Sequence, residues 1–199
     1  MARSHAAIAL VCFLAAFMAT GLQTSTKIVD SLPSTVDVNV TQYLGLWYQV
    51  YADFIVLATF SNNSYCAQAT YGPIDSNGHI GVHNWERQYS TDGPVRQIDG
   101  YAYAPNSSNT GQLMVHLDGV PADAPYWILA VGPVVNDQYQ YAVVSDEFRI
   151  TLFVLARDVQ GFNSTYNDYV VNSLLPELGF SGFNGPIPIQ QVGCTYQKK

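Results

Sequence analysis

Charged residues are scarce in this 199-residue chain, and basic residues are the scarcest. Only 12% of the residues are Asp, Glu, Lys or Arg, and eight Lys and Arg stand against fifteen Asp and Glu, giving a net charge of −7. A chain with so few cations has no basic face to neutralise a run of phosphates, which argues against nucleic acid as a partner. With 48% hydrophobic residues, the sequence also excludes a disordered acidic tail and predicts a folded domain with a substantial core.

Long apolar runs, internal repeats and low-complexity linkers are also lacking beyond the first residues. Residues 6–19 form an uncharged apolar run, which follows Arg3 and ends in the small residues of Ala19-Thr20-Gly21. This pattern is typical of a secretory signal peptide, and the run is short for a membrane-spanning helix; a retained signal anchor is the alternative. We therefore expect a signal peptide at 1–21 and one domain at 22–199, secreted to the extracellular space and without a transmembrane segment.

Cysteine is rare, with three in the chain. Cys12 lies in the expected signal peptide, which leaves Cys66 and Cys194. Two cysteines in an oxidising compartment predict a disulfide, which the loop-entropy model values at about 4 to 5 kcal/mol; two separate buried thiols are the alternative. Four glycosylation sequons beside turn-like segments predict a glycoprotein, with acceptors at Asn39, Asn62, Asn106 and Asn163.

Aromatic residues, in contrast, are abundant: 14 Tyr, 9 Phe and 3 Trp. Such side chains suit a pleated, half-buried surface. Short apolar segments separated by turn residues, without helical patterns between them, predict an antiparallel meander that closes into a barrel or folds into a sandwich to hide its edges. The eight expected strands are 47–56, 65–74, 80–89, 95–104, 112–117, 126–131, 139–144 and 150–156.

One segment after the eighth expected strand has helical spacing. Ser164 is its expected N-cap and Gly179 its expected C-terminal stop. A helix with one apolar stripe needs a surface, and the outside of a closed sheet provides one. Residues 187–192 are compatible with a short ninth strand. The apolar positions of the helix are Tyr166, Tyr169, Val170, Leu174 and Leu178.

Motifs at the two ends of the meander resemble the lipocalin family. Gly45-Leu46-Trp47-Tyr48 opens the first strand, Leu155-Ala156-Arg157 closes the last, and Asn136-Asp137-Gln138-Tyr139 is a partial match to a third family motif. Segments 65–71, 125–130 and 141–144 resemble the apolipoprotein D-like and bacterial-type members. The resemblance implies an all-β fold, an eight-stranded antiparallel up-and-down β-barrel with one C-terminal α-helix packed outside. Gly45, Trp47 and Arg157 are expected to seal its floor, because glycine allows close backbone approach and arginine stacks on an indole.

The resemblance also implies a small hydrophobic ligand inside the barrel, such as a sterol, fatty acid, other lipid, retinoid, carotenoid or tetrapyrrole, which the protein carries or scavenges. Alternation on the third strand places Asn84 and Glu86 on one face and His83, Trp85 and Arg87 on the other, and the resemblance places the first set inside. We expect Glu86 to be an unpaired cavity carboxylate that tends to keep its proton; the alternative is a position at the wet mouth. The expected walls, which are ordinary core residues in the alternative interpretation, are Tyr71, Leu117, Tyr126 and Phe153.

The same residues bear on other functions. A lipocalin-fold enzyme acting on a lipid-like substrate would need a nucleophile such as a free cavity thiol, and both remaining cysteines are expected to pair, so no enzymatic activity is predicted. No cofactor or metal is expected, because His79, His83 and His116 do not converge and are expected on the surface. The apolar loop 53–63 could contact a protein or a membrane weakly, but a lid over the barrel mouth is favoured.

Overall fold

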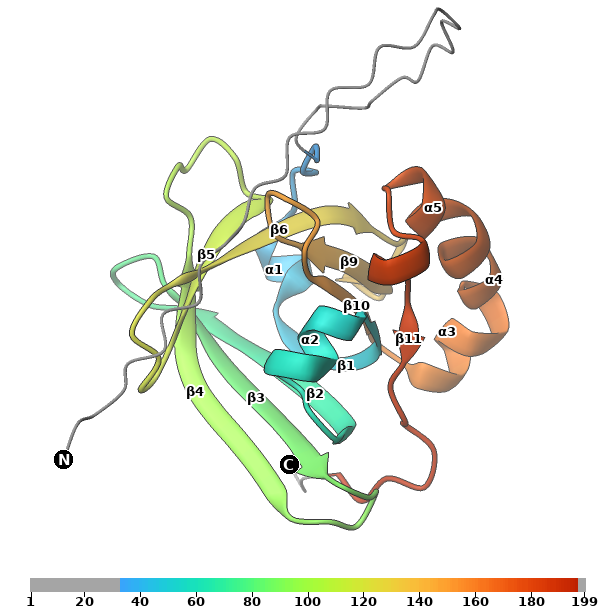
Figure 1. Ribbon diagram of the computed structural model, residues 1–199. Helices are drawn as coiled ribbons and strands as arrows, with labels where there is room; N and C mark the ends of the chain where they lie inside the picture. The colour runs from blue at the N-terminus through green and yellow to red at the C-terminus, as the bar shows by residue number, and fades with distance from the viewer. Residues whose placement is uncertain (1–32, 197–199) are drawn as a thin grey trace, which may run out of the picture. The chain divides into compact units, whose positions relative to one another are not determined.

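The computed structural model describes residues 33–196, so the expected signal peptide at 1–21 lies outside the described part. Eight antiparallel strands form a closed barrel, in which each strand pairs with the next along the chain and β10 pairs back with β1 (Figure 1). This confirms the expected barrel and excludes a sandwich. The barrel strands are β1 (Gly45–Ala52), β2 (Ser64–Ile74), β3 (Ile80–Gln88), β4 (Val95–Tyr103), β5 (Gln112–Leu117), β6 (Ala124–Val131), β9 (Tyr141–Ser145) and β10 (Leu152–Ala156).

Three further two-residue strands lie outside the barrel wall. β7 (Val134–Val135) and β8 (Gln138–Tyr139) form a hairpin whose turn residues, Asn136 and Asp137, both have positive φ, 50° and 59°. Positive φ at both central positions is the type I′ geometry that matches strand twist. β11 (Ile187–Pro188) pairs with the last residues of β1, so the segment 187–192 does supply a short ninth strand.

The expected first strand, 47–56, is too long, because the chain leaves the sheet at Asp53. The Asp53 side chain accepts a hydrogen bond from the backbone N–H of Val56 at 2.8 Å and so begins α2 (Phe54–Thr59). Val56 is fully buried beside Ala52 and Ala67. The segment 53–63, expected to be a loop, therefore contains a short helix with one anchored apolar residue.

The C-terminal helix is present, but the expected N-cap at Ser164 is wrong. Asp158 is the N-cap, since its carboxylate accepts hydrogen bonds from Gln160 and Gly161. The helix runs through α3 (Val159–Thr165), α4 (Asn167–Tyr169), the π-helical turn η1 (Val170–Leu174) and α5 (Leu175–Glu177). Gly179 ends it as expected, with φ +92°. The remaining short helices are α1 (Val40–Tyr43) and η2 (Gly182–Asn184).

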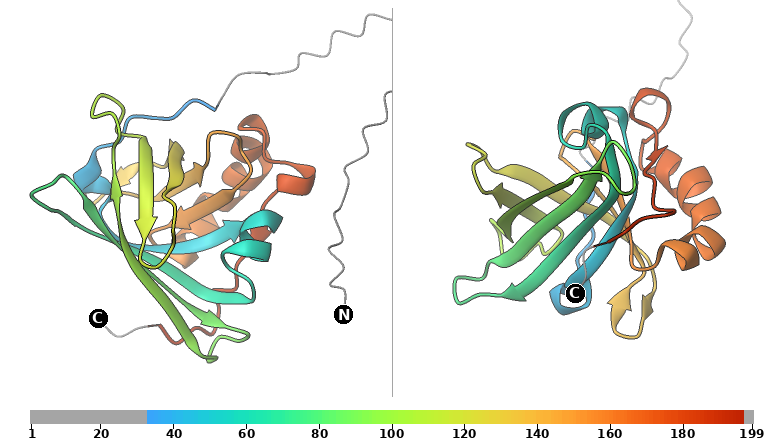
Figure 2. Two further views of the ribbon diagram at one scale, coloured as in Figure 1. Left: turned by 60° about the vertical axis from the view of Figure 1, so that its left-hand side comes forward. Right: turned by 90° about the horizontal axis from the view of Figure 1, so that it is seen from below.

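Alternation along the strands divides the apolar residues into two cores. On β9 and β10, Val144 and Leu155 point into the barrel, whereas Val143 and Val154 point outward beneath the C-terminal helix. Phe162, from α3, is 1% exposed in this outer core, and the helix lies along one side of the barrel (Figure 2). The outer core therefore holds the helix, while the inner face is left to form the interior of the barrel.

Candidate ligand-binding site

The closed end of the barrel is sealed by Trp47 from β1 and Arg157, which follows β10. The guanidinium of Arg157 lies 3.7 Å above the Trp47 ring, and the indole N–H donates to the carbonyl of Tyr43 at 2.8 Å. Trp47 is fully buried. Gly45 has φ +96°, and a side chain there would meet Arg157 at 3.4 Å. Glycine therefore suits both the backbone and the space beneath the arginine.

Arg157 also ties together the segments that meet at this end. It donates to the carbonyls of Leu46 (2.8 Å), Tyr43 (2.9 Å), Gln42 (3.0 Å) and Tyr139 (3.2 Å). Burial lowers the pKa of Arg157 to about 10, so it remains cationic at neutral pH. One side chain thus joins α1, the start of β1 and the 134–139 hairpin.

Three tyrosines stand above this seal on the inner face. The hydroxyl of Tyr126, on β6, shares a hydrogen bond with Tyr43 at 2.8 Å and another with Tyr71, on β2, at 2.7 Å. Tyr43 and Tyr71 are buried, whereas Tyr126 is partly exposed. Burial raises the pKa of Tyr71 to about 12 and those of Tyr43 and Tyr126 well above their ordinary value. We call Tyr43, Tyr71 and Tyr126 the tyrosine triad.

The structure brings most of the residues expected in the wall to the inner face. Tyr71 belongs to the buried inner core, and Leu117, Tyr126 and Phe153 pack against that core while remaining partly exposed. Asn84 pairs with Ala69 and Ile98 on the neighbouring strands and is also partly exposed. Ala69 belongs to the inner core, so strand alternation gives Asn84 the same inward side.

Glu86 is not the unpaired carboxylate that the sequence predicted. It accepts a hydrogen bond from Ser64 at 2.7 Å and forms an ion pair with Arg96, its cross-strand partner on β4. Burial raises the pKa of Glu86, while Ser64 and Arg96 oppose that rise. The prediction failed because alternation was applied to β3 alone, and the neighbouring strand supplies the cation.

Glu86 and Arg96 lie where the barrel meets the segment after α2. Arg96 donates to the carbonyl of Phe60 at 2.7 Å, so it links β4 to the end of that segment. Val56 and the partly buried Leu57 pack near Phe153 and the buried Ala52 and Ala67. The same segment keeps Phe54 and Phe60 more than half exposed. Segment 53–63 is therefore anchored at the barrel rather than projecting freely.

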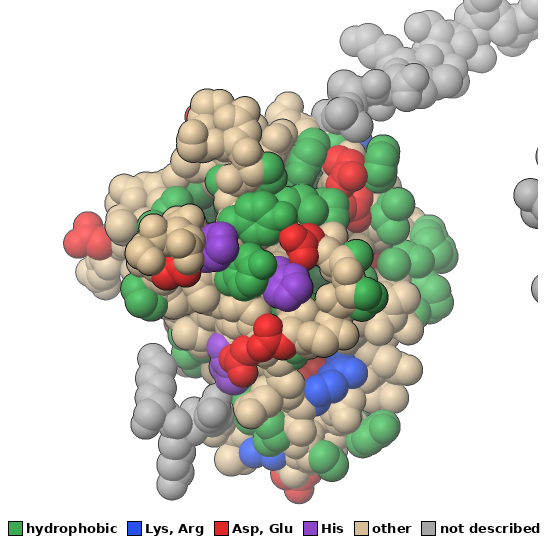
Figure 3. Space-filling model, turned by 90° about the vertical axis from the view of Figure 1, so that its left-hand side faces the viewer, with side chains coloured by type: hydrophobic (Ala, Val, Ile, Leu, Met, Phe, Trp, Pro, Cys, Tyr) green, Lys and Arg blue, Asp and Glu red, His purple; other side chains and the backbone are tan. Residues whose placement is uncertain are grey.

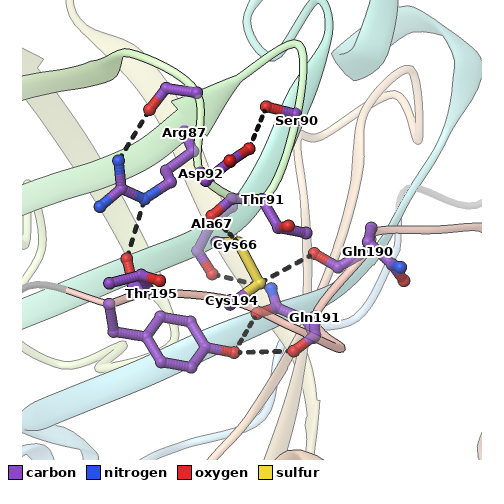
Figure 4. The surroundings of a disulfide bond; sticks show 12 residues. Cys66, Ala67, Arg87, Ser90, Thr91, Asp92, Gln190, Gln191, Cys194 and Thr195 are labelled. Atoms are coloured by element: carbon purple, nitrogen blue, oxygen red, sulfur yellow. Dashed lines mark hydrogen bonds between the residues drawn. A yellow bond between two sulfur atoms is a disulfide. The ribbon is translucent and has the colours of Figure 1, made fainter.

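The expected disulfide joins Cys66, on β2, to Cys194 in the C-terminal segment (Figure 4). The bridge spans 128 residues, which confirms the pairing and leaves neither cysteine as a thiolate nucleophile. Gln191 beside it is buried and donates to the carbonyls of Gln49 and Ala67 at 2.8 and 3.0 Å. Arg87 binds the carbonyl of Thr195 at 2.8 Å, so the C-terminal segment is fastened along the outside of β1 to β3.

Three histidines lie on the outer face of the barrel. His83 contacts Asp99 at 2.7 Å and His116 contacts Asp123 at 2.8 Å, while the rings of His79 and His116 stack on either side of Tyr101. Figure 3 shows histidines beside acidic side chains on this face. Within residues 33–196, no group of three His, Cys, Asp or Glu side chains is arranged to hold a metal ion.

A hollow of about 390 Å³ lies against β5 and β6, where Met114, Pro125, Trp127 and Leu113 line it. Strand pairing places Met114 opposite Pro125, on the side of β5 away from Leu113, which belongs to the inner core. Because Leu113 also lines the hollow, the hollow is not confined to the outer surface of these strands. None of the helices in the described residues has both the length and the hydropathy of a membrane span.

The four expected glycan acceptors are all exposed. Asn39 caps α1, and Asn106 caps its own turn by accepting from Ser108. Asn62 follows α2, in a turn. Asn163 lies within α3, not beside a turn as expected, because the helix begins at Val159.

Sequence reasoning missed two residues of this site, Tyr43 and Arg96. Arg96 could have been found by counting across the turn at Thr91-Asp92-Gly93-Pro94, because that turn sets Glu86 opposite Arg96. Tyr43 had no comparable signal. It precedes the first strand, and its hydroxyl reaches Tyr126, 83 residues away, only when the barrel closes.

Comparisons with known proteins agree with this architecture. Apolipoprotein D from Mus musculus is 35% identical over 114 residues, which are 57% of this chain and 54% of that protein. Temperature-induced lipocalin-1 from Arabidopsis thaliana is 29% identical over 144 residues, 66% of this chain and 69% of that protein. The chain thus spans about half the length of the apolipoprotein D sequences it matches.

Solved structures and a family model extend the comparison. Insecticyanin from the tobacco hornworm Manduca sexta has a TM-score of 0.58 and 17% identity, covering 84% of this chain and 88% of that one. The cockroach allergen Per a 4 has a TM-score of 0.53 and 16% identity, covering 79% of this chain and 91% of that one. The model of the lipocalin-like domain matches residues 38–175. Together with the closed barrel and its Trp47–Arg157 seal, this match shows that the chain belongs to the lipocalin family.

Proposed function

We propose that this protein binds one small hydrophobic molecule inside its barrel and carries or sequesters it outside the cytosol. The observation that carries the proposal is the incomplete burial of side chains that point inward. Leu117, Tyr126 and Phe153 face the inner core, yet each keeps part of its surface accessible. Inward-facing residues in a filled core would be fully buried, so their exposure supports an interior that a guest can enter.

The sizes of the inner side chains also support the proposal. Ala69, Ala102 and Ala142 occupy buried inner positions on β2, β4 and β9. Alanine methyl groups reach only a short way across the barrel, so these strands leave space that larger side chains would fill. Apolar walls with a few polar groups are what a small-molecule site requires.

The mechanism would be partition from water, with no covalent step. A guest that buries about 300 Å² of apolar surface gains about 7 to 8 kcal/mol at about 25 cal/mol per Å². Ordering the guest reduces this gain, so affinity of roughly micromolar order or weaker is expected from burial alone. Polar groups on the inner face, Asn84 and the tyrosine triad among them, would then select between candidate guests.

Segment 53–63 is proposed as a lid rather than a docking surface for a protein or membrane. Within the segment, Val56 packs against Ala52 and Ala67 of the barrel, and Arg96 donates to the carbonyl of Phe60. Both contacts lie at the barrel, where a lid would act, and their loss would be expected to speed ligand release.

Secretion and glycosylation are part of the same proposal. The Cys66–Cys194 bridge supports an oxidising compartment, because cytosolic thiols are normally kept reduced. The four exposed sequons suit a compartment in which glycans are added. Native mass spectrometry of the protein purified from its own source would report the bound molecule and the glycans together.

A pair of substitutions tests the binding site directly. Leu117→Trp adds an indole to the inner face, whereas Val134→Trp adds the same group to the exposed hairpin at the closed end. If the guest occupies the barrel, L117W abolishes its binding and V134W retains it, as measured by native mass spectrometry or calorimetry. Equal binding by both variants would refute the proposal.

A further inference from the structure

The hydrogen bonds within the tyrosine triad leave one donor unused. The triad has three hydroxyl groups and therefore three protons, but its two mutual hydrogen bonds use only two of them. Tyr126, which makes both bonds, is the member that remains partly exposed on the inner face. One hydroxyl proton therefore has no acceptor within the triad, and the central member, Tyr126, packs against the inner core.

The triad is a neutral donor at physiological pH. Burial raises the pKa of all three phenols, so each keeps its proton. A buried hydroxyl without an acceptor is unfavourable, since the water that it would bind has been removed. An oxygen atom on a guest would satisfy it.

A charged end group, in contrast, finds no free cation at this level among residues 33–196. Arg157 is the nearby guanidinium, but it lies over Trp47 and already donates to four carbonyls. A carboxylate placed on the triad would lose its hydration without gaining a counter-ion. The floor therefore favours an uncharged acceptor such as a carbonyl oxygen.

The strand register gives the length available above the floor. Tyr71 lies opposite Val82 on β3, and Glu86, which marks the mouth, is four residues further along that strand. At about 3.3 Å per residue, the distance from floor to mouth is about 13 Å along the strand, which a strand tilt of about 40° reduces to about 10 Å along the barrel axis. On β3, Asn84 lies between these levels, and Leu117 and Phe153 from other strands contribute apolar side chains to the inner face.

We propose that the guest is an elongated neutral molecule with a carbonyl oxygen at its leading end, which accepts a hydrogen bond from the tyrosine triad while its apolar body, about 10 Å long, extends to the mouth. This rests on the proposed function. The triad thereby acts as a specificity device: it adds affinity for the ketone or aldehyde over the corresponding hydrocarbon.

The test compares 2-undecanone with n-undecane, which share a carbon chain of suitable length and differ in the carbonyl. Both are volatile, so headspace gas chromatography measures the free ligand over a protein solution directly. The proteins are the wild type, the triple variant Y43F/Y71F/Y126F and the control Y101F. The triple variant removes the whole hydroxyl network and leaves no buried phenol unpaired, while Tyr101 lies on the outer face between two histidines.

The wild type and Y101F are expected to bind the ketone about fivefold more tightly than the triple variant, as a single neutral hydrogen bond allows. Undecane affinity should be the same in all three proteins, which also shows that the triple variant has folded. If the triple variant retains the full ketone preference, or if the wild type has none, the inference is wrong although the binding function stands. If neither ligand binds the wild type, both the inference and the proposed function fail.

Discussion

Replacing Arg157 by methionine is expected to destabilise the barrel by about 3 to 5 kcal/mol, because this one side chain joins α1, the start of β1 and the 134–139 hairpin. Methionine keeps most of the aliphatic stem and removes the guanidinium. Three hydrogen bonds from the Arg157 guanidinium to carbonyls, at 2.8, 2.9 and 3.0 Å, are short enough to contribute about 1.5 kcal/mol each, as hydrogen bonds to a charged group do. The contact with Trp47 adds about 1 kcal/mol, and renewed hydration of the freed carbonyls returns part of the total.

The assay is urea denaturation followed by circular dichroism, with the disulfide intact. In a thermal melt of a chain of this length, the same loss of about 3 to 5 kcal/mol lowers the midpoint of unfolding by roughly 6 to 20 °C. Arg157→Lys keeps the charge but offers no planar fork, so it is expected to recover only part of the loss. Arg87→Met is the matched control. That arginine also lies over a tryptophan, at 5.4 Å from Trp85, but on the outer face, where it donates to the carbonyls of Gly93 and Thr195; its loss should cost about 1 to 2 kcal/mol, less than that of Arg157.

A loss below about 1 kcal/mol in R157M, or a loss equal to that in R87M, would refute this reasoning. It would mean that α1 and the 134–139 hairpin close the barrel without the arginine. Full recovery by R157K would show that charge alone matters, and that the shared contacts with several carbonyls do not.

Three further predictions follow from the same structure. Burial raises the pKa of Glu86 above its ordinary 4.5, so the folded protein holds this proton more tightly than the unfolded chain does. The contribution of Glu86 to stability is therefore fully present below pH 4.5 and is lost as pH rises through the folded pKa. Glu86→Gln should therefore gain stability relative to the wild type between pH 4 and pH 7 in urea titrations, and a difference independent of pH would contradict this. Reducing Cys66–Cys194 should lower the unfolding free energy by about 5 kcal/mol, less any native strain, and an unchanged urea midpoint in reductant would disprove a stabilising bridge. Asp53→Ala removes the cap of α2 and should cost about 1 to 2 kcal/mol while increasing the ligand off-rate; an unchanged off-rate would argue against the lid.

Much of the barrel could be predicted from local sequence because its determinants are local. Alternation fixes which side of a strand faces inward, and turn residues fix where strands end, so the expected strands overlap the observed barrel strands. The errors occur where an Asp side chain accepts hydrogen bonds from backbone N–H groups and so changes where a helix or strand begins. Asp53 caps a helix where a strand and a loop were expected, and Asp158 caps the C-terminal helix before the expected Ser164. The carboxylate of Asp146 accepts from Ile150 and Thr151, so β10 begins only at Leu152.

The site was harder to predict, since its chemistry arises between strands rather than within them. The pairing of Glu86 with Arg96 depends on the register of β3 against β4, and the tyrosine triad depends on closure of the whole barrel. A pattern on one strand can identify an inward residue, but it cannot say which group that residue meets. Polar inward residues are therefore the ones whose roles most require the folded structure.

The position of the paired charges bears on what the barrel can select. Along the described inner faces of β3 and β4, Glu86 and Arg96 are the charged residues, and each compensates the other at the mouth. Arg157, at the opposite end, is compensated by carbonyl dipoles behind Trp47. An ionised guest entering this space would have to displace one of these partners, whereas a neutral guest leaves both intact. The same contacts that hold the barrel closed at one end and covered at the other thus favour uncharged ligands over ionised ones.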